Sequence, residues 1–311
     1  MVATPLRIGT RASVLARVQS QYVADGLSAV DGRETVLVPV TTEGDVNQRP
    51  LVEFGGAGVF VSALREALLA GEVDVAVHSL KDLPTSAAPG IALAAVPVRE
   101  DPRDAVVARD GLTLAELPAG SRVGTGSPRR AAQLRALGLG FDVVPVRGNV
   151  GTRIGMVTGG ELDAVALAYA GLRRLGRADE VTEVLDPLQM LPAPGQGALA
   201  VECRADEPEL AEQLRAALDD PTTHTAVSAE RSLLAALEAG CSAPVGALAE
   251  VALGEGGEEI WIRAVAAAVD GTQIIKMSTT GAVDDPVGVG RALADDMIAD
   301  GADALIGERV P

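Results

Sequence analysis

A short apolar segment, residues 73–77, leads directly into polar side chains that could do chemistry. The side chains that follow it are His78, Ser79, Lys81 and Asp82. The pattern predicts a buried β-strand with polar residues at its carboxyl end, where open α/β sheets usually bind their ligands. Lys81 is one of only two lysines in the chain and stands beside the carboxylate of Asp82. We therefore place a candidate site here, although a salt bridge in a surface turn would also explain the pair.

The middle of the chain, residues 99–197, contains many arginines and no lysine. Arg129 and Arg130 fall in the first turn of a helix predicted to begin at Gly126-Ser127-Pro128. Free backbone N–H groups, the positive end of the helix dipole and two guanidiniums would together bind an anion. Arg147 ends a predicted strand, and Arg153 lies one turn into the next helix. The same region also contains Arg173 and Arg174.

Arg11 and Ser13 occupy a matching turn between strand and helix near the start of the chain. Because such turns lie on one edge of a parallel sheet, the arginines of both regions are expected to converge on a cleft. Guanidiniums bind carboxylates through paired hydrogen bonds, so the pattern predicts a polycarboxylate ligand, with a polyphosphate as the alternative. Solvated charge on helix surfaces would explain single arginines but not their shared position at turns. Residues 55–58 are glycine-rich but lack the Lys-Ser/Thr of a Walker loop.

Asp82 is the acid that stands out against this basic cleft. A carboxylate surrounded by Arg and Lys stays ionised and would stabilise a cation that forms during a reaction, unless it serves only as the counter-ion of Lys81. No group of His, Cys and Asp residues has the sequence spacing of metal ligands.

The two cysteines lie in different settings. Cys241 falls in a tight turn between Gly240 and Pro244, where it could be a nucleophile or an attachment point, although a lone cysteine is more often inert. No histidine stands near it in sequence to act as its base, which disfavours a Cys/His hydrolase. We interpret Cys203 as a packing residue of a strand, and His78 as better suited to anchoring its turn by a hydrogen bond than to catalysis.

The elements that must position these residues alternate between strands and helices. Arg7-Ile-Gly-Thr-Arg-Ala-Ser and Arg122-Val-Gly-Thr-Gly-Ser-Pro both read as a strand, a Gly-Thr turn and a helix start. A second pair of similar segments, 71–77 and 160–166, follows in the same order. This repetition predicts two duplicated α/β domains with mostly parallel sheets, covered by helices on both faces and separated by a cleft.

A third, smaller α+β domain is predicted after these two. Residues 191–197 (LPAPGQG) form a Pro/Gly-rich crossing, followed by a strand over 198–202 and a helix over 208–218. A helix over 222–239, three strand-like runs and a closing helix over 286–299 then complete the chain. The predicted boundaries are 1–98 with 198–219 for domain 1, 99–197 for domain 2 and 220–311 for domain 3. Residues 41–58 lack periodicity and are expected to form a lid or a binding loop, or else to be disordered.

Composition narrows the class of protein. Apolar residues make up 48% of the 311 residues but aromatic residues only 2%, so the cores must be built from Ala, Val and Leu. A net charge of −17 argues against a nucleic-acid-binding protein. Two cysteines are too few for a disulfide framework, residues 1–9 do not resemble a signal peptide, and no apolar run is long enough to span a bilayer. We therefore expect a cytoplasmic protein with no membrane partner.

The motifs, taken in order over nearly the whole chain, resemble the porphobilinogen deaminase family, also called hydroxymethylbilane synthase. The first motifs are Ile8-Gly-Thr-Arg-Ala-Ser, Thr42-Glu-Gly-Asp, Val77-His-Ser-Leu-Lys-Asp-Leu-Pro and Arg99-Glu-Asp-Pro-Arg-Asp. The later ones are Val123-Gly-Thr-Gly-Ser-Pro-Arg-Arg, Val146-Arg-Gly-Asn-Val-Gly-Thr-Arg, Ala170-Gly-Leu-Arg-Arg-Leu-Gly, Pro194-Gly-Gln-Gly and Gly240-Cys-Ser-Ala-Pro-Val-Gly.

The resemblance implies a transferase of tetrapyrrole and heme biosynthesis. It would condense four porphobilinogen molecules, releasing ammonia at each step, into linear hydroxymethylbilane. Its primer would be a dipyrromethane cofactor, attached to Cys241 by a thioether. The implied fold has two α/β domains like those of periplasmic binding proteins and a third domain that carries the cysteine, in a protein that is usually monomeric. The acetate and propionate groups of each pyrrole would make the growing chain the polycarboxylate expected above.

The resemblance also implies roles for individual residues. Asp82 resembles the catalytic aspartate, which stabilises positive charge on the reacting pyrrole and helps proton transfer. The residues implied to hold the cofactor are Cys241, Lys81, Asp82, Thr125, Ser127, Arg129 and Arg130. The residues implied to bind the incoming substrate and the growing chain are Arg11, Ser13, Arg147, Arg153, Arg174 and Gln196.

The chain departs from the family in the segment 41–58, where Ala57 and Glu53 occupy positions at which members often have lysine. Roles of loop lysines therefore do not transfer to this chain. The chief rival interpretation is a non-catalytic polycarboxylate-binding protein with the periplasmic-binding-protein fold. A third is an enzyme that forms a Schiff base between Lys81 and pyridoxal phosphate. The Lys81–Asp82 pair and the loop of Cys241 favour the deaminase over the binding protein.

Overall fold

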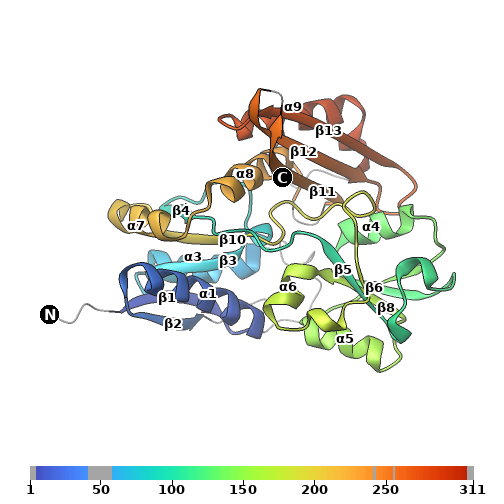
Figure 1. The fold of residues 1–311 in the computed structure, drawn as a ribbon, viewed down its shortest axis with the longest axis horizontal. Helices are drawn as coiled ribbons and strands as arrows, with labels where there is room; N and C mark the ends of the chain where they lie inside the picture. The colour runs from blue at the N-terminus through green and yellow to red at the C-terminus, as the bar shows by residue number, and fades with distance from the viewer. Residues whose placement is uncertain (1–4, 41–57, 241–242, 255, 307–311) are drawn as a thin grey trace. The chain divides into compact units, whose positions relative to one another are not determined.

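The computed structural model describes residues 5–40, 58–240, 243–254 and 256–306. Cys241, Glu53 and Ala57 lie outside the described residues. The chain divides into two compact units, the first formed by residues 1–100 and 198–224 and the second by residues 101–197 and 225–311. Figure 1 shows the strands and helices of each unit.

The first unit is built on a five-stranded sheet in the order β2-β1-β3-β10-β4, in which β1, β2 and β3 are parallel and β10 is antiparallel to both of its neighbours. Helices α1 and α7 pack their apolar side chains on one face of this sheet, and α3 packs on the other face. The strands are β1 (Leu6–Arg11), β2 (Thr35–Val40), β3 (Val75–Ser79), β4 (Ile91–Ala95) and β10 (Leu199–Arg204). The helices are α1 (Val14–Asp31), α3 (Gly58–Leu69) and α7 (Pro208–Leu218).

The second unit contains a sheet of the same design, in the order β7-β6-β8-β5-β9. Here α4 packs on one face, and α5 and α6 on the other. The strands are β5 (Asp104–Ala108), β6 (Arg122–Thr125), β7 (Asp142–Pro145), β8 (Ala164–Ala168) and β9 (Glu183–Val184). The helices are α4 (Pro128–Ala136), α5 (Val150–Thr158) and α6 (Tyr169–Arg174).

The two sheets share their register as well as their strand order. In the first, Gly9 of β1 lies opposite Ala76 of β3, and in the second Gly124 of β6 lies opposite Val165 of β8. A Cβ atom on Gly9 would come within 3.1 Å of Val73, and one on Gly124 within 2.6 Å of Leu162, the residue that corresponds to Val73 in the sequence repeat. Glycine is therefore needed at the same place in both units, because the segment that enters the next strand packs against it.

Polar contacts repeat in the same way. The backbone N–H of Arg7 donates to Asp74 (2.9 Å), and that of Arg122 donates to Asp163 (2.7 Å). The predicted duplication of the α/β domains is thus visible in order, register and contacts. One expectation needs refinement: each sheet contains an antiparallel strand, β10 or β5, which is the first strand after the chain has crossed from the other unit.

The C-terminal part of the second unit forms the predicted small α+β structure. Strands β11 (Val245–Gly254), β12 (Gly257–Ala267) and β13 (Ile274–Ala282) form an antiparallel sheet. One face of it packs on α8 (Pro221–Ala236), α9 (Pro286–Ala299) and α10 (Ala302–Leu305). The segment 191–192 also contacts this sheet, since the N–H of Ala247 donates to the carbonyl of Pro192 (2.9 Å). Within the described residues, no helix combines the length and the apolar character needed to cross a membrane.

We expect Gly246→Ala to destabilise the second unit. A Cβ atom there would lie 2.8 Å from the carbonyl oxygen of Leu191 and 3.0 Å from that of Pro192, and backbone atoms yield less readily than side-chain ends. Overpacking of this kind costs about 1–3 kcal/mol. Urea unfolding followed by circular dichroism would measure the change.

The matched control is Gly155→Ala in α5, where a Cβ atom would meet nothing within 4 Å. Removing a glycine from a helix interior should stabilise by about 0.5–1 kcal/mol. Equal unfolding midpoints for the two variants would contradict the close approach of β11 to segment 191–192.

Candidate functional site

Four of the expected residues lie at one edge of the first unit's sheet. Arg11 ends β1, and Ser13 caps α1, its Oγ accepting from the N–H of Ala16 (3.2 Å). Lys81 and Asp82 lie in a short 3₁₀ turn directly after β3, and both are half-buried. Because β1 and β3 are parallel neighbours, their carboxyl ends, and therefore these residues, share this edge.

The end of β3 is held by its neighbours. The side-chain amide of Gln19 on α1 donates to the hydroxyl of Ser79 (3.0 Å). The N–H of Leu80 donates to the carbonyl of Ala198 just before β10 (3.0 Å). The turn that carries Lys81 and Asp82 is therefore held both by α1 and by the residue before β10.

Glu202 on β10 contacts the same strand one residue before the end of β3, at His78. It is 3% exposed and accepts two hydrogen bonds from Arg65, at 2.6 and 3.0 Å, while Nε2 of His78 lies 3.3 Å from its carboxylate. Burial by itself would raise the pKa of Glu202, but His78 and Arg65 outweigh it and hold that pKa at about 2. His78 therefore packs against an acid of the neighbouring strand.

In the second unit, the start of α4 brings two arginines into the interior. Ser127 caps the helix, accepting from the N–H of Arg130 (3.4 Å), and its own N–H donates to Oγ1 of Thr125 (3.2 Å). Pro128 occupies the first helical turn, where its missing N–H costs nothing. Arg129 and Arg130 are only 3% and 6% exposed.

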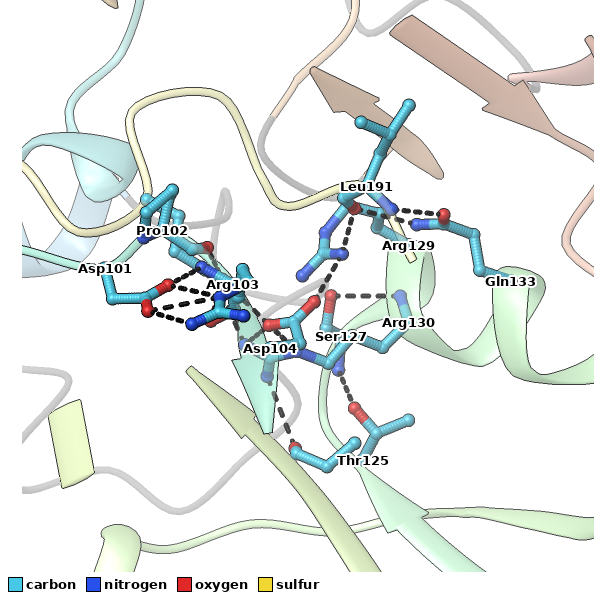
Figure 2. Close-up of polar contacts among 12 residues, drawn as sticks. Asp101, Pro102, Arg103, Asp104, Thr125, Ser127, Arg129, Arg130, Gln133 and Leu191 are labelled. Carbon is cyan, nitrogen blue, oxygen red and sulfur yellow. Dashed lines mark hydrogen bonds and ion pairs between the residues drawn. The ribbon is translucent and has the colours of Figure 1, made fainter. Parts of the chain in front are cut away.

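Asp104, the first residue of β5, lies between these two guanidiniums (Figure 2). It is fully buried and lies 2.8 Å from Nη1 of Arg129 and 2.8 Å from Nη2 of Arg130. Burial would raise the pKa of Asp104, but the two positive charges outweigh it and hold that pKa far below its usual range. Burial, together with the like charge of Arg130, lowers the pKa of Arg129 despite the opposing effect of Asp104.

Two further arginines lie near this pair. Arg153 donates from Nε to the carbonyl of Gly148 (2.9 Å). The pKa of Arg153 is lowered first by burial and then by the charges of Arg130 and Arg147, so both of these guanidiniums lie close enough to repel that of Arg153. We call Arg129, Arg130, Arg147 and Arg153 the arginine cluster. Among the described residues, Arg129, Arg130 and Arg153 alone carry more positive charge than Asp104 can neutralise, which favours an anionic ligand.

Gln196 and Arg174 complete the expected set in this unit. Gln196 is fully buried, accepts from Arg130 (3.2 Å) and donates to Asp104 (2.8 Å) and to the carbonyl of Pro102 (2.7 Å). Arg174 donates to the carbonyl of Gly197 (2.6 Å). Within the described part of the chain, no group of His, Cys, Asp or Glu could hold a metal ion.

The expected site residues are thus divided between the units. Arg11, Ser13, Lys81 and Asp82 belong to the first unit, and Gln196, Arg174, Thr125, Ser127 and the arginine cluster belong to the second. Sequence reasoning overlooked Asp104 and Gln133, whose amide donates to the carbonyl of Leu191 (3.0 Å) and accepts its N–H (2.9 Å). Two signals were available for Asp104: it is the last residue of the family motif Arg99-Glu-Asp-Pro-Arg-Asp, and it is a single acid at the head of an apolar run, Ala105 to Ala108.

Two family models match the chain. The model described as "Porphobilinogen deaminase, dipyromethane cofactor binding domain" matches residues 6–212. The model described as "Porphobilinogen deaminase, C-terminal domain" matches residues 224–299. Together they cover most of the chain.

Curated proteins of high similarity bear the same name. "Porphobilinogen deaminase 1" of Streptomyces coelicolor is 57% identical over 318 residues, covering 99% of each chain. The "Porphobilinogen deaminase" of Mycobacterium tuberculosis is 56% identical over 306 residues, covering 97% of this chain and 98% of that protein. Among solved structures, the methionine-binding protein MetQ has a TM-score of 0.45 at 13% identity, covering 68% of this chain and 89% of that one.

We expect the stability contributed by Glu202 to depend on pH. The pKa of Glu202 is depressed from 4.5 in the unfolded chain to about 2 in the folded protein. Its ionised carboxylate therefore stabilises the fold at pH values above 4.5, and this contribution is lost as the pH falls toward the pKa of the folded state. Relative to Glu202→Gln, the wild type should be more stable by about 3 kcal/mol at pH 7, since one pKa unit is worth about 1.4 kcal/mol. The difference should shrink between about pH 5 and pH 2.

Urea unfolding of both proteins at several pH values would measure this difference. The control is Glu212→Gln, which removes an exposed partner of Arg215 and should change stability by less than about 1 kcal/mol. A difference between wild type and Glu202→Gln that stayed constant down to pH 2 would rule out a depressed pKa for Glu202.

Proposed function

The chain belongs to the porphobilinogen deaminase family, and we propose which of its residues carry out that family's reaction. It is a hydroxymethylbilane synthase, which condenses four porphobilinogen molecules stepwise, with release of ammonia, on a covalent dipyrromethane primer. The rival interpretation as a non-catalytic binding protein has no support from these relatives, because they are named as deaminases over nearly the full chain.

The arginine cluster fits a ligand with several carboxylates. Each pyrrole of the primer and of the growing chain carries an acetate and a propionate, and guanidiniums bind such groups through paired hydrogen bonds. The Nε atom of Arg129 is buried and, within the described residues, has no hydrogen-bond partner. A buried donor of this kind is costly unless an acceptor reaches it, and a ligand carboxylate would supply one. This orphan donor is the observation that carries the assignment of Arg129 to the primer.

When bound, the dipyrromethane supplies the terminal pyrrole carbon to which each new unit is joined. On the protein's side, Arg129, Arg130, Ser127 and Thr125 hold its carboxylates at the start of α4. Cys241, by its family motif, is the point of covalent attachment. Lys81 provides a further positive charge on the turn after β3.

Asp82 is the residue to which we assign the chemistry. When ammonia leaves porphobilinogen, positive charge develops on the substrate pyrrole, and a carboxylate placed beside it lowers the energy of that state. The same carboxylate can accept a pyrrole proton or return it. The turn of Leu80–Asp82, fixed from both sides of β3, gives Asp82 the rigid support that this role needs.

The incoming substrate and the growing chain are assigned to the remaining cationic and polar groups. These residues are Arg11, Ser13, Arg147, Arg153, Arg174 and Gln196. The condensation requires the charge of Asp82 as well as carboxylate-binding arginines. We also propose three domains, 1–98 with 198–219, 99–197 and 220–311, in a monomer that works in the cytoplasm without nucleic acid or membrane.

We expect Asp82→Asn to abolish elongation while the fold persists. Loss of a charge that stabilises a developing cation costs about a hundredfold or more in rate. Consumption of porphobilinogen would measure activity, and circular dichroism would report the fold. Asp206→Asn, which alters an exposed acid of the same unit, should retain wild-type turnover. Normal turnover by Asp82→Asn would remove Asp82 from the mechanism.

We expect Cys241→Ser to yield protein without the primer. The intact mass of the wild type should exceed that calculated from the sequence by roughly the mass of a dipyrromethane, and this excess should be absent from the variant. Cys203→Ala, which alters the fully buried cysteine of β10, should keep the added mass. An unchanged excess in Cys241→Ser would place the attachment at another residue.

A further inference from the structure

Asp104 occupies a position that the reaction does not explain by itself. It begins β5, a central strand of the second unit's sheet, and lies opposite Ala168 at the end of β8. At this end of the sheet it meets the first turn of α4, where Arg129 and Arg130 are consecutive residues. A fully buried acid is uncommon, and this one has two cationic partners.

The two carboxylate oxygens of Asp104 divide the arginines between them. Oδ1 accepts from Nε of Arg130 (2.9 Å) and lies 2.8 Å from its Nη2, and it also accepts from the amide of Gln196 (2.8 Å). Oδ2 lies 2.8 Å from Nη1 of Arg129, which also donates to the carbonyl of Leu191. The guanidinium of Arg130 is therefore held by hydrogen bonds to Asp104, Ala166 and Gln196, and that of Arg129 by a hydrogen bond to Leu191 and an ion pair with Asp104.

This arrangement decides which donors are left for a ligand. One edge of Arg130, formed by Nε and Nη2, is taken by Asp104. Arg129 is held only through Nη1, and its buried Nε has no partner within the described residues. Without Asp104, Arg129 would keep its bond to Leu191 and Arg130 its bonds to Gln196 and Ala166, but the directions of the donors would be less constrained.

The pair also depends on Asp104 energetically. Two buried guanidiniums side by side repel each other and lose their hydration, and only a buried carboxylate offsets both effects. Asp104 provides this with one negative charge against the two positive charges of Arg129 and Arg130. Asp104 thus stabilises the two buried guanidiniums and still leaves Nε of Arg129 for a ligand.

We propose that Asp104 is a positioning residue that orients Arg129 and Arg130 toward the carboxylates of the primer. The inference rests on the proposed function, since it assigns these two arginines to the primer. A displacement of about 1 Å in a supporting group can cost up to about a hundredfold in rate. The effect should fall on primer attachment and on turnover, and not on the affinity for incoming porphobilinogen, which we assign to other residues.

The test compares wild type with Asp104→Asn in three measurements, made at a temperature where circular dichroism shows both proteins folded. Intact mass gives the fraction of protein that carries the primer. Steady-state kinetics, expressed per primer-bearing molecule, give kcat and KM for porphobilinogen. We expect a smaller primer-bearing fraction and a kcat lower by about tenfold or more, with KM within about twofold of wild type. A merely structural role would reduce the amount of folded protein but leave kcat per primer-bearing molecule unchanged.

Two further variants sharpen the outcome. Asp163→Asn removes another acid that binds two arginines, Arg109 (2.6 Å) and the backbone of Arg122 (2.7 Å), but from the opposite end of β8, and should behave as wild type. Asp104→Glu keeps the charge but moves it by one methylene group. This variant should therefore fold better than Asp104→Asn and still have a reduced kcat. It also provides the test if Asp104→Asn does not fold. Wild-type kcat in either Asp104 variant, or a raised KM at unchanged kcat, would overturn the proposal. A wild type that carries no primer would instead refute the proposed function.

Discussion

The burial of positive charge is the constraint on which this structure depends. Arg129 and Arg130 are consecutive residues, almost fully removed from water, at the start of a helix whose dipole is also positive at that end. Such an arrangement is tolerated only if protein acceptors hold the guanidiniums, and Asp104, Gln196 and the carbonyl of Leu191 do so. The order of strands and the path of segment 191–197 matter for function because they deliver those acceptors.

The two duplicated sheets share one scaffold but differ at the edge where β3 and β8 end. Ser79 of β3 lies opposite Leu199, and the corresponding Ala168 of β8 lies opposite Asp104. Leu80 and Tyr169, the next residues along, donate equivalent hydrogen bonds to Ala198 and Arg103, both 3.0 Å long. By this register Lys81 and Asp82 correspond to Ala170 and Gly171. The first copy thus carries its acid after the parallel strand, and the second carries its acid at the head of the antiparallel strand.

The duplication could be read from the sequence because the repeats reflect local packing. The Gly-Thr pairs lie inside strands β1 and β6, not in the turns predicted for them, and their glycines have to accommodate Val73 or Leu162. The two short motifs therefore occur at the same separation from their partner segments. The direction of β5 and β10 could not be read, because side-chain alternation is the same in parallel and antiparallel strands. The apolar run of β5 is also short and follows Pro102, so no strand was predicted there.

In the candidate site, too, some features could be predicted from the sequence and others could not. Arginines at helix starts are visible in a sequence, because capping residues and proline mark where a helix begins. The pairing of these arginines with Asp104 is not visible in the sequence. Asp104 ends a family motif, but its contact with Arg129 and Arg130 follows only from the order of strands, which places β5 beside β8 and against α4. Gln196 belongs to a motif that predicts contact with substrate, and the structure adds that both ends of its amide are engaged by Arg130, Asp104 and Pro102.

The overall charge of −17 does not conflict with a polyanionic ligand, because the net charge of the protein and the local charge of the site act over different distances. At physiological salt, charges more than about 8 Å apart across solvent are largely screened, so a ligand at the site experiences mainly the local field. Inside the protein the screening is weaker and each guanidinium counts for more. A few buried arginines can therefore outweigh many exposed acids, provided that something holds them together in the interior. Among the described residues, Asp104 is the carboxylate that pairs with both Arg129 and Arg130, and for this reason its position constrains the site as much as the number of arginines does.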